Sequence, residues 1–181
     1  MIHSVLLSLT RSLSEHITLS LGLREEKVVL SSLSREDRSS PPGKIVVSLV
    51  NIERETSAGI RFGTHPVNSG QYSHRFPAWN LNLYVLIAAV FPDKQYEEGL
   101  RLLSGAVHFL QSHLTFPVAD QETPVAVEPV NLSFSEQSNL WAVCGNVYYP
   151  SVLCRVRMLS VDQEAIRSVV PGIHTQRRSY T

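Results

Sequence analysis

The sequence is short of cysteines, of charged residues and of long apolar runs, and each shortage narrows what the chain can be. Cys144 and Cys154 are its only 2 cysteines. They neither require nor support an oxidising compartment, and we expect both to be buried thiols. No uninterrupted apolar run approaches the about 20 residues that a membrane-spanning helix needs, so we expect no direct membrane insertion.

The N-terminal segment MIHSVLLSLTRSLSEHITLSLG is rich in leucine but does not read as a secretory signal. It lacks a basic start and a small-residue cleavage site, and polar residues interrupt every turn. We therefore expect a cytoplasmic protein. Apolar residues recur every three or four positions from Ile2 to Ile17, which predicts a helix that docks on a sheet and ends near Gly22. We expect His16 at the margin of this helix, half-buried.

Charge is scarce and balanced. Lys and Arg total 16, Asp and Glu total 16, and the formal net charge is +0. General binding to a phosphate backbone needs a basic balance, so nucleic acid is not an expected partner. Charged residues make up 18% of the chain, against roughly 25% in soluble domains. Electrostatic repulsion between identical copies of such a chain is weak, which favours a role as a subunit of an assembly.

The sequence contains none of the usual catalytic or phosphate-binding motifs, such as GxSxG, GxxxxGK[ST] or GxGxxG after a strand. His108 and His113 are expected on different faces of one helix, and His65 and His74 have no cysteine or acidic partner at ligand spacing. Cys144 lies in an apolar phrase, where a thiol behaves as a small hydrophobe rather than a nucleophile. We therefore predict no catalytic residue, no metal site and no cofactor.

Strand and helix patterns predict an α+β fold, a mixed α/β sandwich in which helices cover one mostly antiparallel sheet. After the N-terminal helix, the predicted elements are strands at 27–33, 44–55 and 80–91, a helix at 95–114, a strand at 130–134, a short helix at 135–146 and a strand at 151–161. The strand at 80–91 is apolar on both faces, so both should be covered. Ser135 is the expected N-cap of the short helix, with Ser138 or Asn139 as weaker candidates.

The helix at 95–114 carries one set of apolar residues at helical spacing, which should face the core. They are Tyr96, Leu100, Leu103, Val107, Leu110 and Leu114. Gly99 and Gly105 each lower helix stability by about 1 kcal/mol relative to Ala. We expect these glycines to permit close approach of another backbone.

Large side chains gather in segments without a catalytic motif, and such segments are candidate interfaces. The connection 56–79 is far longer than the median of about 4–6 residues, and its aromatic content favours ordering against a partner. Its candidate contact residues are Ile60, Arg61, Phe62, Tyr72, Phe76 and Trp79. Further candidates are Trp141, Tyr148, Tyr149, Arg155 and Arg157. Trp141 is equally suited to the core.

The tail at 162–181 begins with a short helical pattern and ends basic. Arg167, Arg177 and Arg178, near Tyr180, either touch an acidic partner surface or a nucleic acid, or belong to a frayed terminus. The predicted organisation is one domain at 1–161, with a long inserted loop at 56–79, followed by this tail.

Three sequence segments together resemble a known family: MIHSVLLSL, NLNLYVLIAAVF leading into YEEGLRLLSGAVHFLQ, and VNLSFSEQSNLWAVCGNVYYPSVLCRVRML. Their order is similar to that of the tube-terminating cap proteins of phage-tail-like contractile injection systems, of the antifeeding-prophage type. The likeness covers nearly all of 1–161. Its most specific pieces are Leu140-Trp141, Pro150-Ser151 and Arg155-Val156-Arg157. Cys154 stands where that family commonly has an aromatic, and the tail matches nothing in it.

The resemblance implies a homo-hexameric ring on the end of the inner tube away from the baseplate, where the cap stops growth of tube and sheath and holds the last sheath layer. The implied partners are sister copies, the inner tube protein and the sheath protein, and no catalysis is implied. A closed ring of identical subunits joins one patch to a different patch. The connection 56–79 is then the candidate for reaching a neighbour or the tube. The strand at 151–161 and the tail are the candidates for meeting the sheath by strand addition.

Three other functions stay open at this point. They are a tail terminator or head–tail joining protein of a contractile phage, a small hydrolase or metal enzyme, and a nucleic-acid-binding module. A capsid gene nearby would favour the first, activity and metal analysis would test the second, and salt-dependent binding would mark the third.

Overall fold

A computed structural model describes the backbone of residues 1–33, 43–55, 64–68, 71–75, 79–119, 124–145, 147–161 and 166–171. Side chains are described in the same ranges except 64–75 and beyond 157. The chain divides into two compact units. The larger unit consists of Met1–Glu53 and Asn82–Met158, and the smaller unit of Arg54–Leu81 and Leu159–Thr181.

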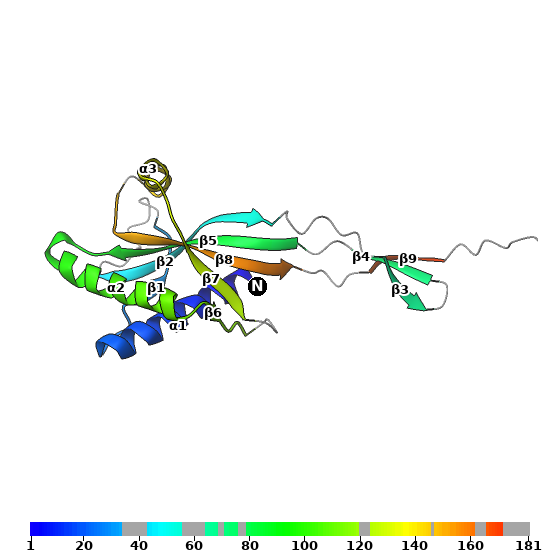
Figure 1. The fold of residues 1–181 in the computed structure, drawn as a ribbon, viewed down its shortest axis with the longest axis horizontal. Helices are drawn as coiled ribbons and strands as arrows, with labels where there is room; N and C mark the ends of the chain where they lie inside the picture. The colour runs from blue at the N-terminus through cyan, green and yellow to red at the C-terminus, as the bar shows by residue number, and fades with distance from the viewer. Residues whose placement is uncertain are drawn as a thin grey trace, which may run out of the picture. The chain divides into compact units, whose positions relative to one another are not determined.

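A six-stranded sheet with the order β1-β2-β5-β8-β7-β6 forms the centre of the fold (Figure 1). Its strands are β1 (Val28–Leu30), β2 (Lys44–Arg54), β5 (Trp79–Val90), β6 (Thr115–Phe116), β7 (Val125–Val130) and β8 (Ser151–Val161). β1 is parallel to β2, whereas β7 is antiparallel to both β6 and β8. The Gly43 N–H donates to Val90 O and the Ala89 N–H to Pro150 O, so β2 and β8 also run antiparallel to β5. The predicted mostly antiparallel sheet is confirmed.

Helices cover both faces of this sheet. They are α1 (Ile2–Leu21), the short 3-10 helix η1 (Asp93–Gln95), α2 (Tyr96–Ser112) and α3 (Phe134–Val143). α1 and α2 pack against each other on one face, and α3 lies on the opposite face (Figure 1). The predicted α+β sandwich is therefore confirmed. Within the described residues, no helix has both the length and the apolar content that crossing a membrane requires.

β5 is buried on both faces, as its apolar pattern predicts. Leu86 and Ala88 pack in one cluster with Trp141 of α3. Because side chains alternate along a strand, Leu83 and Val85 point to the other face, where both are fully buried. The sheet is thus the middle layer of the larger unit.

Two sequence predictions near α3 are wrong. The strand predicted at 130–134 lies earlier, as β7, and the helix begins at Phe134. Its N-cap is Ser133, not Ser135. The Ser133 hydroxyl accepts from the Glu136 N–H at 3.3 Å, and the Glu136 carboxylate accepts from the Ser133 N–H at 2.8 Å. This reciprocal capping box satisfies both backbone donors, which a start at Ser135 would leave unpaired.

The predicted core face of α2 is also wrong. Leu102, Ala106 and Phe109 are buried, whereas most of the predicted core residues are exposed. The glycines explain the difference, because both lie on the buried side. A Cβ on Gly99 would stand 3.0 Å from Phe91 Cδ2, and one on Gly105 would stand 3.3 Å from Ile17 Cγ1. The glycines thus admit neighbouring side chains, not a backbone.

The smaller unit contains a three-stranded sheet with the order β3-β4-β9. β3 (Thr64–Asn68) and β4 (Gln71–Arg75) form an antiparallel hairpin, and β9 (Ile166–Pro171) pairs antiparallel with β4. The connection 56–79 therefore contains strands, and the helical start predicted for the tail is wrong at 166–171. The predicted boundary at residue 161, between one domain and a C-terminal tail, stays a prediction.

Candidate functional site

A set of large apolar side chains in the larger unit is left uncovered by the described residues. We call it the apolar surface, and it consists of Tyr96, Leu100, Leu103 and Val107 of α2, Phe134 of α3, and Val147 and Tyr148 of the segment before β8. Tyr96 is 54%, Tyr148 60% and Phe134 91% exposed. Exposed aromatic residues gathered in this way are typical of interfaces between proteins.

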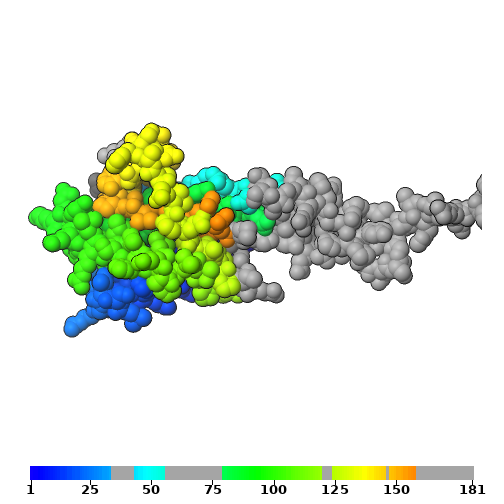
Figure 2. Space-filling model, viewed as in Figure 1, coloured from blue at the N-terminus to red at the C-terminus, as the bar shows by residue number. Residues whose placement is uncertain are grey.

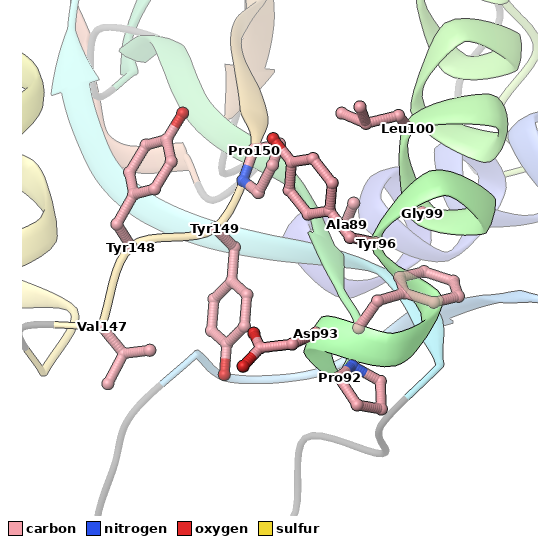
Figure 3. Close-up of a pocket in the computed structure, with 11 residues that line it drawn as sticks. Ala89, Pro92, Asp93, Tyr96, Gly99, Leu100, Val147, Tyr148, Tyr149 and Pro150 are labelled. Atoms are coloured by element: carbon pink, nitrogen blue, oxygen red, sulfur yellow. The ribbon is translucent and has the colours of Figure 1, made fainter.

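Two hollows connect the start of α2, the segment 147–150 and α3 within this surface. The first has a volume of about 450 Å³ and lies between the start of α2 and the segment 147–150, with Tyr96, Leu100 and Tyr148 in its lining (Figure 3). The second, of about 340 Å³, is lined by Phe134 and again by Tyr148. Tyr148 therefore connects the α2 side to α3, which protrudes from the larger unit (Figure 2).

Local sequence dictates where these side chains point. Tyr96, Leu100, Leu103 and Val107 recur at intervals of four and three residues, so they share one side of α2. The other side of α2 carries the buried residues, and these already cover the sheet. α2 therefore has a second apolar side for which the described residues provide no cover.

Trp141 belongs to the core beneath this surface. It is only 5% exposed, and the rings of Tyr148 and Tyr149 stand edge-on to it, with centroid distances of 5.7 and 6.0 Å. Its indole Nε1 is buried and has no hydrogen-bond partner among the described residues. Of the three aromatic contact residues predicted at 141–149, Tyr148 is exposed, Tyr149 is half-buried, and Trp141 supports both.

Arg155 and Arg157 are paired within the sheet. Both guanidinium groups form ion pairs with the carboxylate of Glu128 on β7, with 3.3 Å from Arg157 Nη1 to Glu128 Oε2. The hydrogen bond from Arg155 holds the pKa of Glu128 below its usual value and raises that of Arg155. Tyr84 donates to Glu53 at 2.8 Å beside them, and this bond raises the pKa of Tyr84. A contact of these arginines with a partner stays a prediction.

The remaining predicted contact residues are only partly described. Trp79, the first residue of β5, is 52% exposed, and the Arg54 guanidinium lies 5.0 Å from the centre of its ring. Of Tyr72 only the backbone is described, in β4, where it pairs with Val170. Six others lie outside the described residues: Ile60, Arg61, Phe62 and Phe76 of the connection 56–79, and Arg177 and Arg178 of the tail. Their roles as contacts stay predictions.

The structure brings together histidines that no pattern in the sequence associates. His16 of α1 lies with its ring 5.3 Å from that of His113, and Phe109 contacts both rings. As predicted, His16 is half-buried. Burial lowers its pKa, and the neighbouring His113 and His108 lower it further. Only the packing of α1 on α2 creates this cluster, so no spacing in the sequence signals it.

The described side chains offer little for nucleophilic or metal chemistry. Burial raises the pKa of the Cys154 thiol to about 12 and raises that of Cys144 as well. A reactive cysteine needs the opposite shift, because only the thiolate attacks. No three His, Cys, Asp or Glu side chains gather into a possible metal site in the described ranges. The apolar surface is therefore the feature of the larger unit that best fits a function.

Comparison with known proteins gives a consistent result. Residues 4–175 match the family described as the Pvc16 N-terminal domain, and no curated protein sequence matches the chain. The sheath/tube terminator of the extracellular contractile injection system PVC, in its extended state, has a similar fold, with a TM-score of 0.65 and 15% identity. The alignment covers 100% of this chain and 62% of that terminator. The tube-terminating cap of the anti-feeding prophage gives a TM-score of 0.52 and 16% identity over 96% of this chain and 58% of the cap.

Proposed function

We propose, since the chain belongs to the Pvc16 N-terminal domain family, that it is the cap of a contractile injection system. In this role it sits on the end of the inner tube, ends the growth of tube and sheath, and anchors the last sheath layer. The task is structural and needs no catalysis. The observation that carries the proposal is the agreement of the whole chain in fold with a sheath/tube terminator.

The apolar surface supplies a physical reason for assembly. Burying apolar side chains stabilises a contact by roughly 25 cal/mol per Å² removed from water, and aromatic residues contribute most at interfaces. A closed ring joins each copy to the next through two different patches. We assign the apolar surface as one of these patches, with Tyr96, Leu100 and Tyr148 at its centre, and a homo-hexamer as the ring. A balanced net charge of +0 sets up no strong repulsion between copies.

The other predicted contacts complete the proposal. The segment containing the β3–β4 hairpin reaches a neighbouring copy or the inner tube protein, through the predicted residues around Phe62 and Phe76. The strand β8, with Arg155 and Arg157, and the tail meet the sheath protein. Assembly takes place in the cytoplasm, with neither nucleic acid nor membrane as a direct partner.

A deletion experiment tests the function. The gene for this chain is removed from a strain that produces the particles, and particle lengths are measured by electron microscopy. A missing cap should give tubes of uncontrolled length or sheaths that do not persist, and the full chain supplied from a plasmid should restore uniform particles. Uniform particles in the deletion strain would show that the chain is not the terminator.

Two matched variants then test the surface. Leu100→Lys adds a charge to the centre of the apolar surface, whereas Leu19→Lys makes the same change at an exposed position of α1 outside it. Both should fold, because both residues are at least partly exposed. We expect Leu19→Lys to restore uniform particles and Leu100→Lys to fail. Full capping by Leu100→Lys would refute the assigned surface and leave the terminator role intact.

A further inference from the structure

A third hollow, with a volume of about 810 Å³, follows the seam between α1 and α2. We call it the α1–α2 groove. The residues of its lining that matter here are His16, Ser20 and Leu21 of α1 and Arg101, Ser104, His108 and Gln111 of α2. The α2 residues recur every three or four positions, so they share one side of the helix. Each of Arg101, Ser104 and His108 is one residue beyond a member of the apolar surface, a rotation of about 100°. The groove and the apolar surface therefore lie on different sides of α2.

The ionisable side chains in the lining are all nitrogen bases: Arg101, His16 and His108. Among the described residues no Asp or Glu lines the groove, and Glu97, one turn before Arg101, is not part of the lining. The ion pairs among the described residues join Lys27 to Glu98 and the two arginines of β8 to Glu128. Within that part of the chain, Arg101 thus has no carboxylate partner.

Two of the three serines in the lining, both on α2, already donate their hydroxyl protons to backbone carbonyls. Ser104 Oγ donates to Leu100 O at 2.9 Å, and Ser112 Oγ donates to His108 O at 2.8 Å. On α2 the donors that face an incoming group are therefore the Arg101 guanidinium, the His108 ring N–H and the Gln111 amide, and the Ser20 hydroxyl of α1 lies in the same lining. Such a set recognises anionic oxygen, and a guanidinium binds a carboxylate in a two-pronged geometry.

We propose that the α1–α2 groove binds an acidic, extended peptide segment of a partner protein. The spacing of the donors supports an extended segment. Arg101 and His108 are seven residues apart on α2, or about 10 Å at a rise of about 1.5 Å per residue. A peptide in the extended polyproline II conformation covers that distance in about three residues, at about 3.1 Å each, and its three residues per turn bring every third side chain to the same side. Two carboxylates three residues apart therefore reach both groups, while Leu21 provides an apolar wall for the chain between them.

The same geometry argues against two other anions. A small free anion such as phosphate needs several donors that converge within hydrogen-bond distance of one point, and Arg101 and His108 are too far apart for that. A nucleic acid is held by many cationic groups along its backbone. The groove has one arginine, and the chain as a whole has a net charge of +0. The proposal does not depend on the terminator function, because it rests on the groove alone.

Direct binding to the purified full chain tests the proposal. The probe is a fluorescently labelled ten-residue peptide with aspartates three residues apart in a Gly/Ser background, and binding is followed by fluorescence anisotropy. The same peptide with asparagines in place of the aspartates is the uncharged control. We expect saturable binding of the acidic peptide and at least tenfold weaker binding of the control.

Two charge reversals locate the site. Arg101→Glu should weaken binding at least tenfold, and Arg11→Glu, which changes the net charge equally at an exposed position of α1 outside the groove, should leave it unchanged. His108→Ala should weaken binding less than Arg101→Glu. Circular dichroism confirms that each variant is folded.

The proposal is overturned if the acidic peptide does not bind at millimolar concentration, or if Arg101→Glu and Arg11→Glu behave alike. Competition separates the alternatives. Displacement of the peptide by inorganic phosphate at a similar concentration would indicate a site for small anions. Stronger binding of a labelled oligothymidine, lost in Arg101→Glu, would indicate a nucleic-acid site.

Discussion

The imidazole rings of His16 and His113 stand nearly at right angles, with 5.3 Å between their centroids. Phe109 fills the space beside them, stacked on His113 with a centroid distance of 4.8 Å. Two positive charges at this separation repel each other, and partial burial disfavours even one of them. The packing of α1 on α2 therefore favours the neutral form of His16.

This arrangement predicts a loss of stability in mild acid. The pKa of His16 is lowered by burial and then by His113 and His108, so it is below the value of 6.5 that the unfolded chain has. Just below pH 6.5 the unfolded chain binds more protons than the folded chain, and stability rises with pH. We expect full stability above that pH and a falling melting temperature from pH 6.5 downwards. Circular dichroism melts between pH 5 and 8 measure it.

Matched substitutions test whether His16, at the contact between α1 and α2, causes that loss of stability. In His16→Gln the decline of the melting temperature in this range should be smaller than in the natural chain. His3→Gln, at an exposed position near the start of α1, should leave the decline as it is. An identical pH dependence in all three proteins would show that His16 does not control it.

A second prediction concerns the two glycines of α2. In Gly99→Ala the new methyl group would stand 3.0 Å from the Phe91 ring, closer than carbon atoms normally approach, so the buried ring must shift. Overpacking of this kind costs about 1–3 kcal/mol, more than the about 1 kcal/mol that alanine adds to helix propensity. In Gly105→Ala the nearest atom, Ile17 Cγ1, is 3.3 Å away, and we expect a change near zero. Urea unfolding of both variants gives the comparison, and a stabilised Gly99→Ala would contradict it.

A third prediction tests the N-terminus of α3. Ser133→Ala removes the hydroxyl that accepts from the Glu136 N–H, and the loss of such a cap costs about 0.5–2 kcal/mol. Ser135→Ala, two residues later and exposed on the helix, should cost less than 0.5 kcal/mol. Urea unfolding separates the two. A larger loss in Ser135→Ala would restore Ser135 as the cap.

The sequence predicted those parts of the fold in which one pattern dominates. β5 is apolar on both faces and could only be an inner strand, and α1 has a single apolar side that faces the core. α2 has two apolar sides of similar strength, so its sequence alone favoured the wrong one. The sequence from 64 to 75 contains Pro66 and Gly70 and shows no alternation of apolar and polar residues, which hides the strands β3 and β4.

The sequence predicted which types of residue form the candidate site better than it predicted which individual residues are exposed there. Tyr148 and Tyr149 were expected as contacts because aromatic residues are enriched at interfaces, yet they differ in burial although they are neighbours. Tyr96, Leu100 and Val107 were expected in the core, and their exposure depends on how α2 is rotated against the sheet. The α1–α2 groove and the contact between His16 and His113 arise from the packing of two helices that are far apart in the sequence. No local sequence pattern predicts such packing.

The two adjacent tyrosines separate stability from assembly. Tyr149 packs in the cluster around Trp141, so Tyr149→Ala should lower the free energy of unfolding by about 2–4 kcal/mol, as for other large truncations in cores. Tyr148 is 60% exposed, and Tyr148→Ala should cost only the edge-on contact with Trp141, about 0.5–1.5 kcal/mol. If the apolar surface is an interface, Tyr148→Ala should nevertheless cap particles poorly at a temperature where it is fully folded. Urea unfolding and particle lengths, measured on the same variants, provide the comparison. Normal capping by folded Tyr148→Ala would remove Tyr148 from the interface, and equal losses of stability in both variants would mean that the two rings share one structural role.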